Sequence, residues 1–160
     1  MSLGLKALFG GKGFLKVDTS GHTEHLDFST YLQGKRVVAI YFGAPYKEED
    51  HADYRTCMLG SSVADAAYRP TLISRNSGFL ERLKEIFDDL QQDLELLKDV
   101  AIVYVSSDRN EDEFLQSVRM MPWAAVQYDD PSRKLLQARF GVLNIPRVAI
   151  VNEQGKICAE

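Results

Sequence analysis

The chain contains three short runs of apolar and mostly β-branched residues, each bounded by polar turns. They cover residues 37–42, 100–105 and 148–151. Such runs are typical of strands buried on both faces, as in a sheet covered by helices. Residues 152–155 then predict a hairpin turn into a further strand at residues 156–158. We therefore predict a central sheet that ends in an antiparallel pair.

Helical periodicity fills the spaces between these strands. Over residues 79–97, apolar residues recur at every third or fourth position, with Glu, Lys, Asp and Gln between them. This spacing predicts an amphipathic helix. A second helix is expected over residues 108–120, with Phe114, Leu115 and Val118 turned toward the core.

A third helix is expected before the last central strand. It covers residues 132–140, carries Leu135 and Leu136 on its inner face, and stops at Gly141. Strand–helix–strand order implies a right-handed crossover and a parallel pair of strands at the centre of the sheet. The predicted fold class is therefore α/β: a central mixed β-sheet flanked by helices on both faces.

Composition and charge narrow the range of partners. Hydrophobic residues make up 45% of the 160 residues and charged residues 26%, close to the average for a globular protein. One domain over residues 1–160 is expected. The net charge is −4, with Lys and Arg scattered along the chain, so neither a nucleic acid nor a membrane is the expected partner. No apolar leader follows Met1, which favours a cytoplasmic location.

Two cysteines limit the redox chemistry that the chain can perform. Cys57 and Cys158 lie 101 positions apart, so the chain contains no Cys-x-x-Cys pair. Cys57 is the candidate catalytic residue, because the neighbouring Arg55 would stabilise its thiolate; an unreactive loop thiol is the alternative. Cys158 is expected to be a small buried hydrophobe.

Three histidines offer only a weak metal-binding pattern. His22 and His25 flank Glu24, and His51 follows Asp50. Structural zinc sites need four ligands, and no third and fourth partner is evident. We therefore expect surface histidines, no metal and no cofactor.

Four segments occur in an order that is characteristic of one known protein family. They are the strand at residues 35–44, the strand with a polar end at 103–108, the sequence Met121-Pro122-Trp123, and the stretch 140–146 that ends in Ile-Pro. Over residues 30–155 the chain resembles the tryparedoxin and nucleoredoxin family. The resemblance implies a thioredoxin-like fold with an active-site loop after residue 44.

The cysteines of the family motif Trp-Cys-x-x-Cys are missing at the position that the resemblance implies. Read without a gap, Tyr46 takes the place of Trp, and Lys47 and Asp50 take the places of the two cysteines. A second register places Ser62 and Asp65 there, after an insertion. In either register, residues 46–78 contain an insertion or cover segment. Neither register places a cysteine at the two motif positions.

The resemblance also implies a peptide-binding loop. Ile145, Pro146 and Arg147 match the cis-proline loop, whose backbone pairs with an extended substrate, and the Ile145–Pro146 bond is predicted to be cis. Tyr46 and Trp123 are the aromatic residues expected on the same side. The family's C-terminal helix is expected to be absent, since the chain stops at Glu160.

Two functions remain open at this point. The first is a non-catalytic module that holds a peptide or protein partner between residues 44–50 and the Pro146 loop. The second is a single-thiol reductase in which Cys57 reacts with a low-molecular-weight thiol or a protein disulfide.

Residues 46–70 are predicted to be the least ordered stretch, packed over the position of the missing dithiol. They contain few large apolar residues to offset the about 1–2 kcal/mol that ordering each backbone residue costs.

Overall fold

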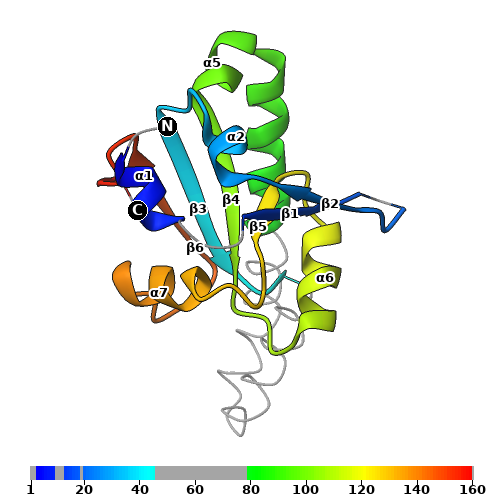
Figure 1. Ribbon diagram of the computed structural model, residues 1–160. Helices are drawn as coiled ribbons and strands as arrows, with labels where there is room; N and C mark the ends of the chain where they lie inside the picture. Colours follow the sequence, from blue (N-terminus) through cyan, green and yellow to red (C-terminus); the bar gives the residue numbers. More distant parts are fainter. Residues whose placement is uncertain (1–2, 10–12, 19, 46–78, 160) are drawn as a thin grey trace, which may run out of the picture.

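A seven-stranded mixed sheet forms the centre of the molecule (Figure 1). The structure is a computed structural model and describes residues 3–9, 13–18, 20–45 and 79–159. Within these residues the strands lie in the order β2-β1-β5-β4-β3-β6-β7. The predicted α/β class with a mixed sheet is confirmed.

The three apolar runs form the middle of this sheet, as the sequence predicts. β3 (Val37–Gly43) pairs in parallel with β4 (Val100–Ser106) and antiparallel with β6 (Arg147–Asn152). The predicted hairpin is also present, since β7 (Ile157–Ala159) pairs antiparallel with β6.

Three strands that the periodicity does not predict complete the other half of the sheet. β5 (Ala124–Val126) pairs in parallel with β4, and β1 (Phe14–Val17) pairs antiparallel with β5. β2 (Thr23–Leu26) pairs with β1 and forms the edge opposite β7.

Three short helices cover one face of the sheet, which we call the α1 face. They are α1 (Leu3–Leu8), α2 (Phe28–Leu32) and α7 (Ser132–Arg139). Leu5, Leu32 and Leu136 from these helices pack on the strand residues that point to this side, Val38 and Ile40 among them. This layer forms the larger part of the core.

The opposite face, which we call the α6 face, is covered by α6 (Glu111–Arg119) and by a helix over residues 79–92. Leu80, Phe114, Val118 and Trp123 are buried there. Asn110 caps α6 by accepting a hydrogen bond from Glu113 N at 2.9 Å, so the helix begins later than the predicted residue 108.

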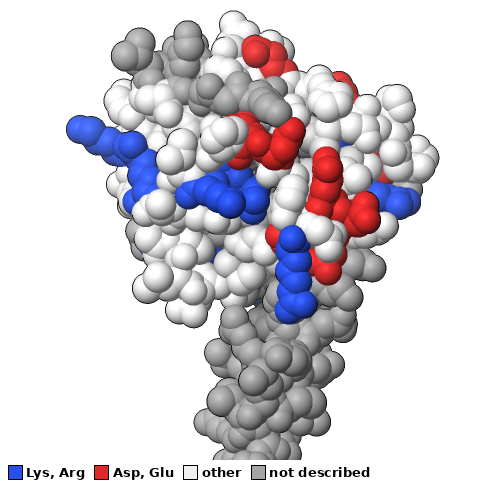
Figure 2. Space-filling view, turned by 60° about the horizontal axis from the view of Figure 1, so that its bottom comes forward, with Lys and Arg blue, Asp and Glu red and all other residues white. Residues whose placement is uncertain are grey.

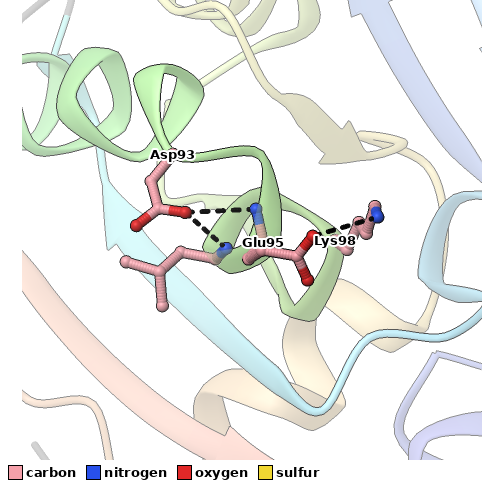
Figure 3. Close-up of polar contacts among 4 residues, drawn as sticks. Asp93, Glu95 and Lys98 are labelled. Carbon is pink, nitrogen blue, oxygen red and sulfur yellow. Dashed lines mark hydrogen bonds and ion pairs between the residues drawn. The ribbon is translucent and has the colours of Figure 1, made fainter.

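The helix predicted over residues 79–97 is two helices. The first ends at residue 92, and α5 (Leu94–Asp99) begins immediately afterward. Asp93 causes the break: its carboxylate accepts hydrogen bonds from Glu95 N at 3.1 Å and from Leu96 N at 3.3 Å (Figure 3). An Asp at this position supplies acceptors for backbone amides that have no partner inside the new helix.

Two burial predictions need correction. Leu94 and Leu135, expected on inner helix faces, are 68% and 67% exposed. Of the three apolar runs predicted as central strands, only β4 is nearly continuously buried; in β6 and in the first half of β3, buried residues alternate with half-buried ones. These strands are therefore well covered on the α1 face and only partly covered on the α6 face.

Candidate functional site

The carboxyl ends of β3 and β4 meet the beginning of β6 at one edge of the sheet. Gly43 stands opposite Ser106, and Phe42 stands opposite Arg147. We call this place the carboxyl edge; it comprises residues 43–45, 106–108 and 145–147. In open α/β sheets, ligands bind outside the carboxyl ends of parallel strands, so this is the candidate site.

The loop before β6 has the backbone geometry that the sequence predicts. The Ile145–Pro146 peptide bond is cis. Ile145, Pro146 and Arg147 are each half-buried. The Arg147 guanidinium donates from Nη1 to Gly141 O at 3.0 Å, which ties the start of β6 to the turn that follows α7.

A buried polar cluster lies beneath the carboxyl edge. The Tyr104 hydroxyl is 2.8 Å from Gly43 O and 2.6 Å from Asp108 Oδ2. The Ser106 hydroxyl donates to the same Asp108 oxygen, and the Ser117 hydroxyl donates to Oδ1 at 2.8 Å. The Asp108 side chain is only 4% exposed. The cluster thus joins the end of β3, the turn after β4 and the middle of α6.

The electrostatics of this cluster favour a neutral phenol. Burial raises the pKa of Tyr104 well above its ordinary value, and the charge and hydrogen bond of Asp108 raise it further. Tyr104 therefore keeps its proton over the physiological range and holds the end of β3 by a hydrogen bond, with no charge of its own.

Gly43 leaves room for the aromatic ring of the same strand. A Cβ atom at this position would lie 2.8–2.9 Å from ring atoms of Tyr41, closer than side chains approach one another. Gly43 O also accepts a hydrogen bond from Ser107 N at 2.8 Å. The carbonyl of Gly43 therefore holds the end of β3 in place, and the absence of a side chain at Gly43 lets the Tyr41 ring pack beside it.

A second set of contacts attaches α7 to the same edge. Arg133 Nη1 and Gln137 Nε2 donate to Ser106 O at 3.0 and 2.8 Å. The Arg133 guanidinium also lies 4.3 Å from the ring centroid of Tyr128, a cation–π geometry. Helix α7 therefore supports the turn that leads from β4 into α6.

Charges are separated across this side of the molecule. Figure 2 shows acidic side chains gathered mainly right of the centre and larger basic groups to the left. The first turn of α6 contributes Glu111, Asp112 and Glu113, and α7 carries Arg133, Lys134 and Arg139. Acidic side chains therefore lie on α6 and basic side chains on α7, the two helices that contact the turn after β4.

Trp123 belongs to the core beneath the site. Its side chain is 1% exposed and contacts Phe87 and Tyr41 edge to face, with ring centroids 5.5 and 6.5 Å away. Its Nε1 has no hydrogen-bond partner within the described part of the chain. Its position is that of a packing residue.

Several predicted site residues lie outside the described residues. These are Tyr46, Lys47, Asp50, Cys57, Ser62 and Asp65, so both registers and the predicted order of residues 46–70 stay predictions. Cys158, expected to be buried, is exposed, because β7 is an edge strand.

The histidines that the structure describes lie on the surface. His22 and His25 are exposed, at and next to the edge strand β2. Over residues 3–9, 13–18, 20–45 and 79–159, no three His, Cys, Asp or Glu side chains group to hold a metal. No helix in these same ranges is long and apolar enough to cross a membrane.

The polar cluster is the part of the site that sequence reasoning missed. The signal for it was the sequence Ser106-Ser107-Asp108 directly after a buried strand. The sequence does not indicate that Tyr104 contacts Gly43, because these two residues are 61 positions apart.

Comparisons with known proteins agree with this geometry. The family described as Thioredoxin-like matches residues 34–157. A probable nucleoredoxin 3 from Oryza sativa subsp. japonica is 33% identical over 81 residues, which are 49% of this chain and 16% of that protein. Nucleoredoxin from Bos taurus is 40% identical over 57 residues, 35% of this chain and 13% of its own length. The chain thus spans less than a fifth of these curated relatives.

Solved structures show the same fold. Native tryparedoxin I from Crithidia fasciculata superposes with a TM-score of 0.63 at 23% identity, covering 98% of this chain and 85% of that one. Thioredoxin from Wuchereria bancrofti superposes with a TM-score of 0.61 at 20% identity, covering 92% of this chain and 81% of that one. At this level of identity the likeness establishes the architecture.

Proposed function

This chain belongs to the thioredoxin-like family and resembles nucleoredoxins and tryparedoxins within it, and from that premise we propose that it is a non-catalytic module that binds an extended peptide. The proposal rests on one observation: the elements around the binding loop are present, and the paired cysteines are absent. The carboxyl edge has a half-buried proline loop at residues 145–147 and a firmly anchored turn, whereas the chain contains no Cys-x-x-Cys pair.

Dithiol exchange needs an attacking thiolate and a second thiol within reach. The two cysteines of this chain lie 101 positions apart. Cys158 follows Ile157, which pairs with Val151 toward the far end of β6 from Pro146. It is therefore poorly placed to act as a resolving thiol at the carboxyl edge.

A peptide in extended form would use the backbone next to Pro146. Main-chain hydrogen bonds give affinity in this binding mode, and pockets for alternate side chains give specificity. The acidic turn of α6 and the basic side chains of α7 would favour peptides that carry opposite charges at their two ends (Figure 2).

The proposal is tested with a random heptapeptide library selected on the immobilised chain. Peptides that depend on the carboxyl edge should lose at least about tenfold in affinity, about 1.4 kcal/mol, in an Ile145→Asp variant. An Ile157→Asp variant controls for the added carboxylate, because Ile157 is exposed on β7. Ile145 packs against the core of the α1 face, so circular dichroism must show that both variants are folded. Equal binding by both variants, or no selected peptide at all, would contradict the proposal.

The alternative is a single-thiol reductase, favoured by the redox names of the relatives. In that reaction the Cys57 thiolate attacks a disulfide sulfur, forms a mixed disulfide and releases a thiolate. The thiolate of a low-molecular-weight thiol then attacks the substrate sulfur of the mixed disulfide. A disulfide between these two sulfurs forms, and Cys57 leaves as the thiolate. Insulin reduction with dithiothreitol distinguishes the two functions. We expect no turnover above background; turnover that Cys57→Ser abolishes and Cys158→Ser retains would establish the reductase.

A further inference from the structure

The loop that carries Pro146 follows helix α7 directly, and the end of this helix determines how the two are joined. Gly141 has a φ of 60°, a left-handed conformation in which glycine commonly ends a helix. Gly141 N donates to Ala138 O at 3.2 Å. Val142 N then donates to Gln137 O at 3.0 Å. The main chain of Gln137 therefore holds the beginning of the Pro146 loop.

The side chain of Gln137 contacts another segment of the carboxyl edge. Its Nε2 donates to Ser106 O at 2.8 Å and to Ser107 Oγ at 3.1 Å. Ser107 N in turn donates to Gly43 O at 2.8 Å, at the end of β3. The half-buried Gln137 thus bonds the turn after β4 directly and reaches the end of β3 through Ser107.

The beginning of α7 is held by a different side chain. Arg133, in the first turn of the helix, donates from Nη1 to Ser106 O at 3.0 Å and from Nε to Tyr128 O at 2.9 Å. Gln137 lies one turn later, next to the Pro146 loop. Without the Gln137 amide, α7 would stay attached at its beginning, and its end would be free to move.

The Pro146 loop would follow such a movement as one piece. Arg147 Nη1 donates to Gly141 O at 3.0 Å, which closes the loop between its first and last residues. Val142 and Ile145 also pack together against the core of the α1 face. A shift at the end of α7 therefore displaces the loop relative to the ends of β3 and β4.

We propose that Gln137 is a positioning residue of the carboxyl edge: its amide fixes the Pro146 loop relative to the ends of β3 and β4 and thereby sets the affinity for an extended peptide. The inference rests on the proposed peptide-binding function. Segments that are fixed before binding need not be ordered by the peptide, and this saves part of the free-energy cost of association.

The proposal is tested by calorimetric titration of the 160-residue chain with a peptide selected on it. Gln137→Met keeps the length of the side chain and removes the donor, so the affinity should fall about three- to tenfold. Gln137→Lys keeps a donor within reach of Ser106 O and should restore most of the affinity. Asp93→Ala, which weakens the cap of α5 before the amino end of β4, controls for lost stability and should leave the affinity unchanged.

A double-mutant cycle tests whether Gln137 acts through the turn after β4. Ser107→Ala removes one of the two acceptors of the Gln137 amide. If the two residues act together, the combined Gln137→Met and Ser107→Ala variant should lose no more affinity than Gln137→Met alone. Additive losses would contradict the proposal.

A measurement without peptide separates this inference from the proposed function. In the free chain, the ¹⁵N order parameters of the amides of residues 141–145 should fall from about 0.85, typical of a rigid backbone, toward about 0.6 in Gln137→Met. They should not change in Asp93→Ala. A selection that yields no peptide would contradict the proposed function, and the order parameters alone would then show whether Gln137 positions the loop.

Other results would overturn the proposal. These are unchanged peptide affinity in a folded Gln137→Met variant, an equal loss in Gln137→Lys or in Asp93→Ala, or order parameters of residues 141–145 that stay as in the original chain. Circular dichroism shows whether each variant is folded.

Discussion

Asp108 is the residue at which most polar contacts of the carboxyl edge converge. Its carboxyl group receives the Ser106 and Ser117 hydroxyls and contacts Tyr104, and its carbonyl accepts from the Tyr128 hydroxyl at 3.2 Å. Removing one partner of such a cluster leaves several buried polar groups without a hydrogen bond, which costs more than the loss of the bond itself.

We therefore expect Asp108→Ala to lower the free energy of unfolding by about 3 kcal/mol or more, measured by urea denaturation. Asp108→Asn keeps one acceptor oxygen and should cost clearly less. Equal losses in the two variants would show that the cluster does not depend on the acceptors of residue 108.

Tyr104 gives the same cluster a pH dependence. The folded-state pKa of Tyr104 is raised, so the folded protein retains a proton that the unfolded chain loses. The contribution of Tyr104 to the free energy of unfolding is complete below the ordinary pKa of tyrosine. It decreases as the pH rises above about 10. The unfolding free energy should therefore fall in alkali, and Tyr104→Phe should reduce the slope by up to about 1.4 kcal/mol per pH unit. An unchanged slope would contradict the assignment.

At the scale of elements, the interruption at Asp93 separates helix 79–92 from α5. Asp93→Ala removes the acceptor for two backbone amides. It should lower the free energy of unfolding by about 1 kcal/mol. Lys98→Ala is the control: Lys98 and Glu95 form an exposed pair 3.5 Å apart, and such pairs contribute about 0–1 kcal/mol. Thermal unfolding followed by far-ultraviolet circular dichroism measures both. If Asp93→Ala leaves the melting temperature unchanged, α5 does not depend on this cap.

The elements that sequence analysis identifies correctly are those with strong apolar patterns. β3, β4 and β6 are apolar runs. The parallel pairing of β3 with β4 follows from crossover rules, whereas the antiparallel pairing of β6 with β3 does not. β2 could not be identified, because Thr23, Glu24 and His25 are polar and exposed. The break at Asp93 was hidden because Leu94 and Leu97 continue the helical spacing, although Leu94 faces solvent.

The candidate site was predictable only in part. The family resemblance indicates Pro146 and its neighbours, since a proline loop is local in sequence. The Tyr104–Asp108 cluster depends on Gly43 from another strand, and on Ser117 from the middle of α6. Contacts between segments so far apart arise from the fold itself and leave no periodic pattern in the sequence.

At the scale of the whole molecule, Trp123 can report on the integrity of the α6 face. It is the single tryptophan of the chain and is 1% exposed. We expect blue-shifted fluorescence that resists quenching by acrylamide in the native state, and a red shift on unfolding that coincides with the loss of circular dichroism. Easy quenching in the native protein would show that this layer opens to solvent.

The close approach of the two ends of the chain has a consequence for engineering. A Cβ atom at Gly4 would overlap Gln154 O, and one at Gly155 would lie 2.9 Å from Gly4 O, so α1 rests directly on the β6–β7 turn. Figure 1 shows both termini on this side of the molecule. When the ends of a domain are neighbours, they can be joined covalently and the chain reopened elsewhere. A circular permutant that begins at Asp93 would keep every strand pairing and place its new ends where the helical layer is already interrupted.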